Sequence, residues 1–209
     1  SRGPRTFLGA TPERLVDLHG REFRTVAMAG STPRGRDEEH DGELAAALLA
    51  SDKEREEHAV VVDMLREALQ PVALELRIPR APEVVPFRHV QHLVTPVSGL
   101  LRDDADVLSL VERLHPTPAV GGTPRDLALE LIAEEEPHDR GWYAGPLGWV
   151  DRAGDGEFVV GLRSGVVKDD EVTLFAGCGI VADSDPEREW DESSTKLLAL
   201  GSALGRIDS

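Results

Sequence analysis

The sequence is poor in several residue types, and each scarcity excludes a class of protein. It has one cysteine, Cys178, among 209 residues, so an internal disulfide framework is excluded and a reducing, cytoplasmic compartment is expected. Aromatic residues make up only 4%, so leucine, valine and alanine must supply most of the core. No apolar run approaches the length that spans a bilayer and no signal-peptide pattern is visible, so we expect no membrane association.

Positive charge is also scarce. The formal net charge is −16, and only three of the 23 basic residues are lysines: Lys53, Lys168 and Lys196. Such a surface is unsuited to nucleic acid or to an anionic membrane, because both require basic patches. It would also repel an anionic small molecule unless a metal ion or a few well-placed cations offset the field. The positions of the three lysines therefore matter.

The length suits one large domain or two small ones, and the pattern of elements predicts a single α+β unit. We expect a mostly antiparallel sheet with helices packed on the outside. Strands are expected at 6–9, 23–29, 72–78, 90–94, 143–150, 157–166 and 172–176, and helices at 43–50, 51–70, 105–114, 124–136 and 186–204. The segments 33–42 and 115–124 are rich in glycine and proline and are predicted to be loops.

Two acidic pairs with i,i+3 spacing are the first candidate for chemistry. They are Glu54 with Glu57, and Glu189 with Glu192. On a helix both members of such a pair lie on one face, where they repel each other unless a cation sits between them. A solvated helix face is one interpretation, and a shared Mg²⁺ site is the other. Ser51 and Glu54 also form a predicted capping box, which would occupy the Glu54 side chain and makes Glu57 the better ligand candidate.

The last predicted helix carries a lysine on the same face as its acidic pair. Lys196 follows Glu192 by four residues, so an exposed ion pair and a lysine that reaches a substrate carboxylate are both open interpretations. Gly177 and Gly179 flank Cys178 after the preceding strand. This G-x-G indicates either a tight turn or backbone N–H groups aimed at an anion. Cys178 is interpreted as a packing residue, because no base is evident beside it.

Single residues elsewhere suggest anion binding and proton transfer. Arg163 is expected to point away from Leu162 on a strand, either to bind a carboxylate in bidentate fashion or as a surface charge. His92 is a strand histidine whose role is structural or catalytic. Glu13 follows a proline turn, and it fits either the first turn of a helix or a carboxylic acid held at a cleft.

In sequence order, these segments resemble the chorismate-utilising enzymes, and the isochorismate synthases most closely. The resemblance covers essentially the whole chain. It runs through F-L-G-A-T-P-E-R-L, A-M-A-G-S-T-P-R-G, L-L-A-S-D-K-E-R-E-E-H, H-L-V-T-P, L-H-P-T-P-A-V-G-G-T-P, G-W-Y-A-G-P-L-G-W-V-D, V-V-G-L-R-S, L-F-A-G-C-G-I-V and S-D-P-E-R-E-W-D-E-S-S-T-K.

The resemblance implies a site that binds chorismate and Mg²⁺. Glu57 and Glu192 would ligate the metal directly, with Glu54 and Glu189 beside them or bridging through water. The substrate carboxylates and ring would be surrounded by Gly30, Ser31, Ala119, Val120, Tyr143, Leu162, Arg163, Phe175, Gly177, Gly179 and Lys196. His92 would lie next to the substrate as a further catalytic candidate.

The implied reaction adds water at C2 of chorismate and removes the C4 hydroxyl. Glu13 matches the general acid that protonates that hydroxide, which requires a pKa raised by a partly dry pocket. Ala119 and Arg125 in the Pro-rich segment favour isochorismate formation over the branches that make anthranilate, aminodeoxychorismate or salicylate. The resemblance leaves siderophore and menaquinone pathways open, and it implies a monomer.

One element of the family pattern has no match. The general base of the family is a lysine on a strand upstream of the G-A-T-P-E segment, and none of the three lysines holds that place. Residues 1–209 are therefore expected to form the C-terminal part of the chorismate-binding fold, with its N-terminal part absent. An alternative hypothesis follows, in which this chain alone is inactive and only binds Mg²⁺ and anions.

Overall fold

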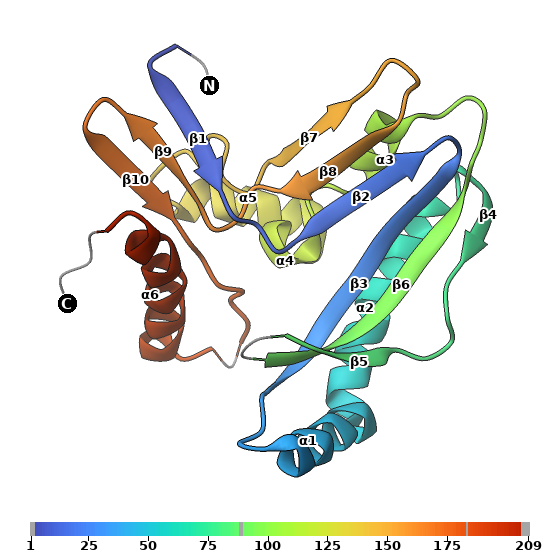
Figure 1. Cartoon of the computed structure of the whole chain (residues 1–209), viewed down its shortest axis with the longest axis horizontal. Helices are drawn as coiled ribbons and strands as arrows, with labels where there is room; N and C mark the ends of the chain where they lie inside the picture. The colour runs from blue at the N-terminus through green and yellow to red at the C-terminus, as the bar shows by residue number, and fades with distance from the viewer. Residues whose placement is uncertain (1–2, 88–89, 183, 206–209) are drawn as a thin grey trace. The chain divides into compact units, whose positions relative to one another are not determined.

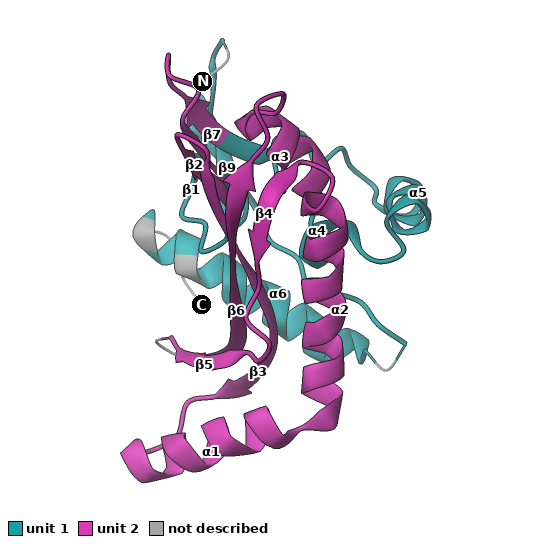
Figure 2. Ribbon diagram, turned by 90° about the vertical axis from the view of Figure 1, so that its right-hand side faces the viewer, with its two compact units in different colours: residues 1–14, 115–147, 159–209 teal, residues 15–114, 148–158 magenta. Residues whose placement is uncertain are grey.

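The computed structural model describes residues 3–87, 90–182 and 184–205, which form two compact units (Figures 1 and 2). Unit 1 comprises residues 1–14, 115–147 and 159–209, and unit 2 comprises residues 15–114 and 148–158. Antiparallel strands and helices make up both units. The predicted α+β class is confirmed.

Unit 2 is built on a long antiparallel pair of strands, β3 and β6. The sheet to which they belong has the order β4-β6-β3-β2-β8-β7, with β5 paired to β6. Its strands are β2 (Arg14–His19), β3 (Glu22–Pro33), β4 (Ala73–Arg77), β5 (Glu83–Pro86), β6 (Val90–Leu101), β7 (Pro146–Val150) and β8 (Gly156–Val160). The β3–β6 register shifts between Met28 and Ser31, which marks a bulge beside Gly30.

Three helices accompany this sheet: α1 (Glu38–Ala50), α2 (Asp52–Leu69) and α3 (Val107–Leu114). Helix α2 contacts β3, β4 and β6, and Figure 2 shows it running beside them. The buried face of β6 carries Gln91, Leu93, Thr95 and Val97, while the alternate residues are half-buried, His92 among them, or exposed, as Pro96 is. The predicted strand at 90–94 is present, and two of the residues on its buried face, Gln91 and Thr95, are polar.

Unit 1 contains a smaller three-stranded antiparallel sheet with the order β1-β9-β10. Its strands are β1 (Arg5–Gly9), β9 (Ser164–Lys168) and β10 (Glu171–Phe175), and its helices are α4 (Pro118–Gly121), α5 (Arg125–Glu135) and α6 (Pro186–Ala203). The Asp185 carboxylate caps α6 by accepting hydrogen bonds from the N–H groups of Glu187 and Arg188 at 3.1 Å. The predicted start of this helix is therefore confirmed.

Several predicted boundaries are wrong for local reasons. Helix α1 begins at Glu38 rather than at residue 43, because the Asp37 carboxylate caps it by accepting from His40 N–H at 2.9 Å. The predicted loop 115–124 contains the short helix α4. The next helix starts at Arg125 rather than at residue 124, with Pro124 at its N-cap position. Strand β2, at residues 14–19, was not predicted.

Two further predictions on the C-terminal third are corrected. The single strand predicted at 157–166 is interrupted at residues 161–163, where Arg163 has a positive φ of 44°. β7 begins at Pro146, so Tyr143 lies in a turn rather than on a strand. The apolar residues of α6 are only partly buried, since Leu200 is buried but Trp190 is 73% exposed.

Candidate active site

Glu13 lies in unit 1 immediately before β2 and is held from three directions. Its carbonyl oxygen accepts from Val160 N–H at 3.0 Å, and its own N–H donates to Thr11 Oγ1 at 3.2 Å. The Thr117 hydroxyl donates to Oε1 at 3.0 Å. Burial raises the pKa of Glu13, and the Thr117 hydrogen bond lowers it in part. Glu13 is thus a partly buried carboxyl group, and its alternative place in the first turn of a helix is wrong.

The Pro-rich segment next to Thr117 is braced by an arginine. Arg140 Nη1 donates to the Val120 carbonyl oxygen at 2.8 Å, and its Nε donates to Glu136 at 2.8 Å. The guanidinium carbon also lies 5.9 Å from the centre of the Tyr143 ring, in a cation–π arrangement. One arginine therefore links α4, the end of α5 and the turn that carries Tyr143. On α4, Ala119 is exposed and Val120 is half-buried.

Tyr143 and Phe175 come together although 32 residues separate them in the sequence. Their rings stack with centroids 5.5 Å apart and an angle of 16° between planes. Burial raises the pKa of Tyr143, which stays a neutral phenol. A Cβ at Gly177 would lie 3.0 Å from the Tyr143 hydroxyl oxygen, so only glycine fits there without a shift. These three predicted substrate residues are neighbours within unit 1.

Helix α6 meets the same glycine-rich turn through a lysine. Lys196 Nζ donates to the Gly177 carbonyl oxygen at 2.9 Å and lies 2.6 Å from Glu192 Oε1. Glu189 is connected to this turn through its backbone, since its carbonyl oxygen accepts from the Cys178 thiol at 3.6 Å. Gly179 is exposed next to that thiol. The i,i+4 pair predicted for Glu192 and Lys196 is therefore present, and the lysine also reaches the turn.

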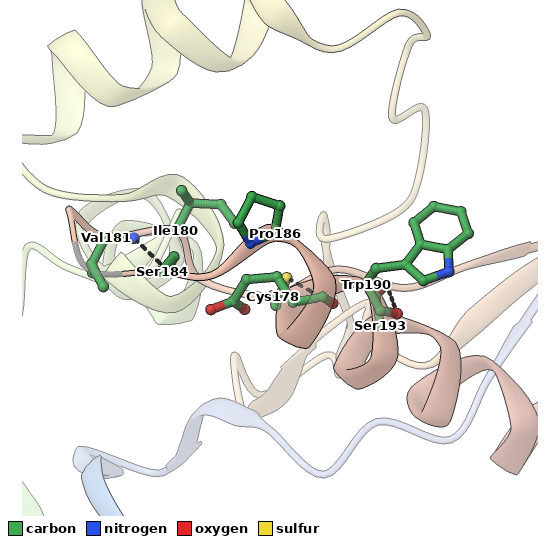
Figure 3. A pocket seen from close by; sticks show the side chains of 8 residues that line it. Cys178, Ile180, Val181, Ser184, Pro186, Trp190 and Ser193 are labelled. Carbon is green, nitrogen blue, oxygen red and sulfur yellow. Dashed lines mark hydrogen bonds between the residues drawn. The ribbon is translucent and has the colours of Figure 1, made fainter.

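Cys178 borders a hollow of about 380 Å³ that is also lined by residues of α6 (Figure 3). Ile180, Val181 and Trp190 also line it, and all three are strongly exposed. Burial raises the pKa of the Cys178 thiol, so it remains protonated at neutral pH and is a poor nucleophile. Of the residues predicted to bind substrate or metal, only Glu189 borders this hollow.

Arg163 stands outside regular structure. Its exposed side chain follows half-buried Leu162 in the segment between β8 and β9, and its carbonyl oxygen accepts from Ala10 N–H at 3.0 Å. The prediction that it alternates with Leu162 along a strand is wrong, because the positive φ turns the chain at this point. Just before it the chain bends at Gly161, where Leu162 N–H donates to the Val160 carbonyl oxygen at 2.7 Å.

In unit 2, the first acidic pair has unequal members. Ser51 Oγ caps α2 by accepting from Glu54 N–H at 3.3 Å, but the Glu54 carboxylate does not return to Ser51. Glu54 Oε2 instead accepts from Ser31 N–H at 3.2 Å. The predicted capping box is therefore only half formed. Glu57 is 55% exposed and lies 3.8 Å from Lys53 Nζ.

His58 connects α2 to the strands beneath it. Its Nδ1 is 3.1 Å from the Ala29 carbonyl oxygen and its Nε2 is 2.7 Å from Thr95 Oγ1. A carbonyl only accepts, so Nδ1 carries the proton and Nε2 accepts from the Thr95 hydroxyl. Burial lowers the pKa of His58, in keeping with this neutral form. In the sequence, His58 shares one helix face with Val61, Val62, Leu65 and Leu69, and a histidine in such an apolar stripe was the available signal.

His92 lies on β6 opposite Ser31 of β3. Its ring meets Phe87 edge-on, with centroids 5.4 Å apart. Burial lowers the pKa of His92, while a hydrogen bond with the Gly30 backbone raises it in part. Within unit 2 the structure thus brings together His92, Gly30, Ser31 and Glu54.

The metal prediction rests on donor chemistry. Among residues 3–87, 90–182 and 184–205 there is no group of three or more histidine, cysteine, aspartate or glutamate side chains placed to hold a metal ion. Each acidic pair does offer carboxylate oxygens, the donors that Mg²⁺ prefers, with one member more than half exposed. The residue types therefore fit Mg²⁺, with Glu54 and Glu57 in unit 2 and Glu189 and Glu192 in unit 1.

Comparison with known proteins decides the family. A family model described as chorismate binding enzyme matches residues 1–205. The chain belongs to the chorismate-binding enzymes. It is 49% identical over 206 residues to the salicylate biosynthesis isochorismate synthase of Pseudomonas aeruginosa, a match that covers 99% of this chain and 43% of the relative.

Solved structures of chorismate-binding enzymes share the fold. An isochorismate synthase from Bacillus anthracis, named as 2,3-dihydroxybenzoate-specific, is 43% identical with a TM-score of 0.84, covering 96% of this chain and 54% of that one. The anthranilate synthase component I of Streptococcus pneumoniae is 30% identical, also with a TM-score of 0.84, covering 95% and 44%. The chain thus spans about half the length of the relatives it matches.

Three hydrogen bonds of this chorismate-binding enzyme were not predicted from its sequence. They join Thr117 to Glu13, Arg140 to Val120, and His58 to Ala29. Each joins residues at least 20 positions apart, which no local pattern reveals.

The described part of the chain contains no helix long and apolar enough to cross a membrane.

Proposed function

We propose that this chain is the chorismate-binding part of an isochorismate synthase, an isomerase that adds water at C2 of chorismate and removes the C4 hydroxyl. The observation that carries the proposal is Glu13, a half-buried carboxyl group whose pKa is raised by burial. A carboxyl group with a raised pKa holds its proton to higher pH, and while protonated it can donate that proton to a leaving hydroxide. The identity to the Pseudomonas aeruginosa enzyme supports the same reaction.

Substrate binding in unit 1 is assigned to a set of residues that includes the stacked rings of Tyr143 and Phe175. In this proposal the Lys196 ammonium and the Arg163 guanidinium pair with the substrate carboxylates. Tyr143 donates a hydrogen bond, and the Gly177 and Gly179 backbone lines the same side. Leu162, Ala119, Val120 and Phe175 contact the ring. In unit 2, the residues assigned to substrate binding are Gly30, Ser31 and His92.

We further propose that Glu57 and Glu192 bind Mg²⁺, with Glu54 and Glu189 beside them. When bound, the ion supplies positive charge for the ring carboxylate of chorismate. Each proposed ligand is paired with a lysine here, Glu57 with Lys53 and Glu192 with Lys196, and exposed pairs of this kind are weak enough to exchange for a metal.

Glutamine variants test the metal ligands. In a longer natural chain that contains this sequence, Glu57→Gln and Glu192→Gln should each weaken Mg²⁺ binding in the presence of chorismate, measured by isothermal titration calorimetry. Glu56→Gln is the matched control, because Glu56 is the exposed neighbour of Glu57 on α2. Equal Mg²⁺ affinity in all three variants would remove the assignment.

The reaction also needs a base, and this chain offers no lysine for it in the family's position. Lys53 and Lys196 are paired with Glu57 and Glu192, and Lys168 ends β9. We therefore propose that the 209-residue chain binds Mg²⁺ and anions without turnover, and that the active enzyme, a cytoplasmic monomer, is longer. Ala119 and Arg125 support the isochorismate branch over the salicylate and amination branches.

One assay separates these proposals. The 209-residue chain and a longer natural chain that contains it are incubated with chorismate and Mg²⁺, and isochorismate is measured by liquid chromatography. We expect product only from the longer chain. Product from the 209-residue chain would overturn the missing-base argument. In the longer chain, Glu13→Gln should lower turnover by about 100-fold or more, while Glu171→Gln, exposed on β10, should not.

A further inference from the structure

Thr117 is the N-cap residue of α4. Among the described residues, its side chain accepts no hydrogen bond from a backbone N–H group of that helix. Threonine at this position ordinarily accepts a hydrogen bond from a backbone N–H two or three residues further on. Here the hydroxyl donates to Glu13 Oε1 at 3.0 Å, across 104 residues of sequence. The Thr117 side chain therefore bonds the Glu13 carboxyl group instead of the first turn of α4.

We propose that Thr117 is a positioning residue that fixes which oxygen of Glu13 carries the acidic proton, an inference that rests on the proposed role of Glu13 as general acid. Because Oε1 accepts the Thr117 hydroxyl proton, the proton of the neutral carboxyl group lies on Oε2. The Glu13 backbone is fixed at the same time by Val160 and Thr11, so Oε2 has a defined direction.

The same hydrogen bond assists release of the proton. As the C4–O bond of the substrate breaks, the Oε2 proton moves to the departing oxygen, which leaves as water, and Glu13 becomes a carboxylate. A hydroxyl donates more strongly to a carboxylate than to a neutral carboxyl group. The bond is therefore stronger after proton transfer than before it, which favours the transition state over the bound substrate.

Other ionisable groups are connected to the segments that meet at Glu13. Arg14 is its neighbour, Arg163 lies on the segment bonded to Ala10, and Arg125 Nη2 donates to the His115 carbonyl oxygen next to Thr117. Within the described part of the chain, the pKa of Glu13 is raised by burial and lowered by the Thr117 hydrogen bond, and none of these three arginines shifts it. Burial lowers the pKa of His115, so its imidazole is neutral at pH 7.

The first test measures the acid directly and needs no catalysis. The pKa of Glu13 is followed by carboxyl ¹³C NMR in the 209-residue chain. Thr117→Val should raise this pKa, because it removes the donor that stabilises the carboxylate, and Thr117→Ser should restore it. Thr173→Val, at an exposed threonine of β10, should leave it unchanged. An unchanged Glu13 pKa in Thr117→Val would overturn the inference.

The second test uses turnover by the longer natural chain. Thr117→Val should lower kcat by about tenfold, part of what a general acid contributes, with little change in KM, and should move the alkaline limb of the pH profile upward. In a Glu13→Gln background the same change should cost nothing further. If the two substitutions lower kcat additively, or if the alkaline limb of the pH profile stays at the same pH in Thr117→Val, Thr117 acts only on folding.

The two tests separate failure of this inference from failure of the proposed function. A wild-type longer chain that makes no isochorismate removes the proposed function, while the NMR result on Thr117 and Glu13 still stands or falls by itself. If the Thr117→Val chain unfolds, Thr117→Ala is used instead, because it also removes the hydroxyl and places only a small side chain before α4.

Discussion

Glu54 Oε2 accepts a hydrogen bond from the Ser31 backbone N–H at 3.2 Å, so the first carboxylate of its acidic pair is tied to the bulge of β3. Gly30, with φ of 78°, precedes that N–H. A Cβ at Gly30 would lie 3.1 Å from Glu54 Oε2 and 3.2 Å from Leu93 Cδ1. Gly30, the bulge of β3 and the Glu54 carboxylate are thus packed against one another. Glu57, the other member of the acidic pair, takes no part in this contact.

Gly30→Ala should destabilise unit 2 more than its matched control does. Gly20 also has a positive φ, 59°, but a Cβ there meets no atom within 4 Å, so Gly20→Ala carries the backbone strain alone, about 1–2 kcal/mol. Gly30→Ala adds crowding worth about 1–3 kcal/mol in the free energy of unfolding. Urea titration of both variants checks this, and equal losses would contradict the close packing described.

His58 and Thr95 should behave as a coupled pair. His58→Leu leaves the Ala29 carbonyl and the Thr95 hydroxyl without a partner in a buried site, at a cost of about 2–4 kcal/mol in unfolding free energy. Thr95→Val leaves His58 Nε2 unpartnered. The double variant should lose less than the sum, because valine needs no partner. Strict additivity would argue against the bond, and Val60→Ala, 52% exposed on the same helix, should change little.

Glu13 should cost the fold stability at neutral pH. Its folded pKa lies above the ordinary 4.5, so between these two values the folded chain holds more protons than the unfolded chain. Stability therefore falls as pH rises through that window and stays lowered above it. Glu13→Gln should be more stable than the wild-type chain at pH 8, with the difference vanishing below pH 4.5. Chemical denaturation across pH checks this, and no gain at pH 8 would contradict the raised pKa.

Asp41 should show the opposite sign. Its carboxylate accepts from Arg34 Nε at 2.8 Å, Gly35 N–H at 2.7 Å and Gln91 Nε2 at 3.0 Å, and the Arg34 bonds above all hold its pKa below the ordinary 3.8. Its contribution is present above pH 3.8 and is lost as pH falls through the folded pKa. Asp41→Asn should lower the thermal midpoint at pH 7, and the difference should shrink as pH falls below 3.8.

Asp63 provides the control for that measurement. It is 63% exposed on α2 and pairs only with Arg66 one turn away among the contacts described, so Asp63→Asn should leave the thermal midpoint nearly unchanged. An equal effect of both substitutions would show that general charge, rather than the Arg34 network, sets the stability.

Local signals were sufficient for the elements and for part of the site. Ser51 and Asp185 each cap a helix because their oxygens reach N–H groups two or three residues away, a distance the sequence displays directly. The acidic pairs could be found by spacing for the same reason. The Glu192–Lys196 pair follows from i,i+4 geometry, but the second contact of Lys196, with Gly177, spans 19 residues and does not.

Contacts over long sequence distances lay beyond local patterns. Glu54 was predicted to cap its own helix, and it reaches Ser31 because the bulge brings that N–H to α2. Thr117 has an ordinary cap position, so nothing near it in the sequence indicates Glu13. The segment V-V-G-L-R-S-G-V-V has the composition of a strand, and its interruption at Arg163 is set by tertiary structure. The predicted single chorismate-binding domain over residues 1–209 stays a prediction.

The left-handed backbone of Arg163 has a consequence for engineering. A residue with a side chain at φ 44° costs the fold about 1–2 kcal/mol, which glycine would recover. Selection for heat resistance alone should therefore favour glycine at position 163, and the resulting chain would lose the guanidinium proposed to bind a substrate carboxylate. In laboratory evolution of this sequence, a substitution at position 163 that raises thermal stability would therefore lower the affinity for the ligand.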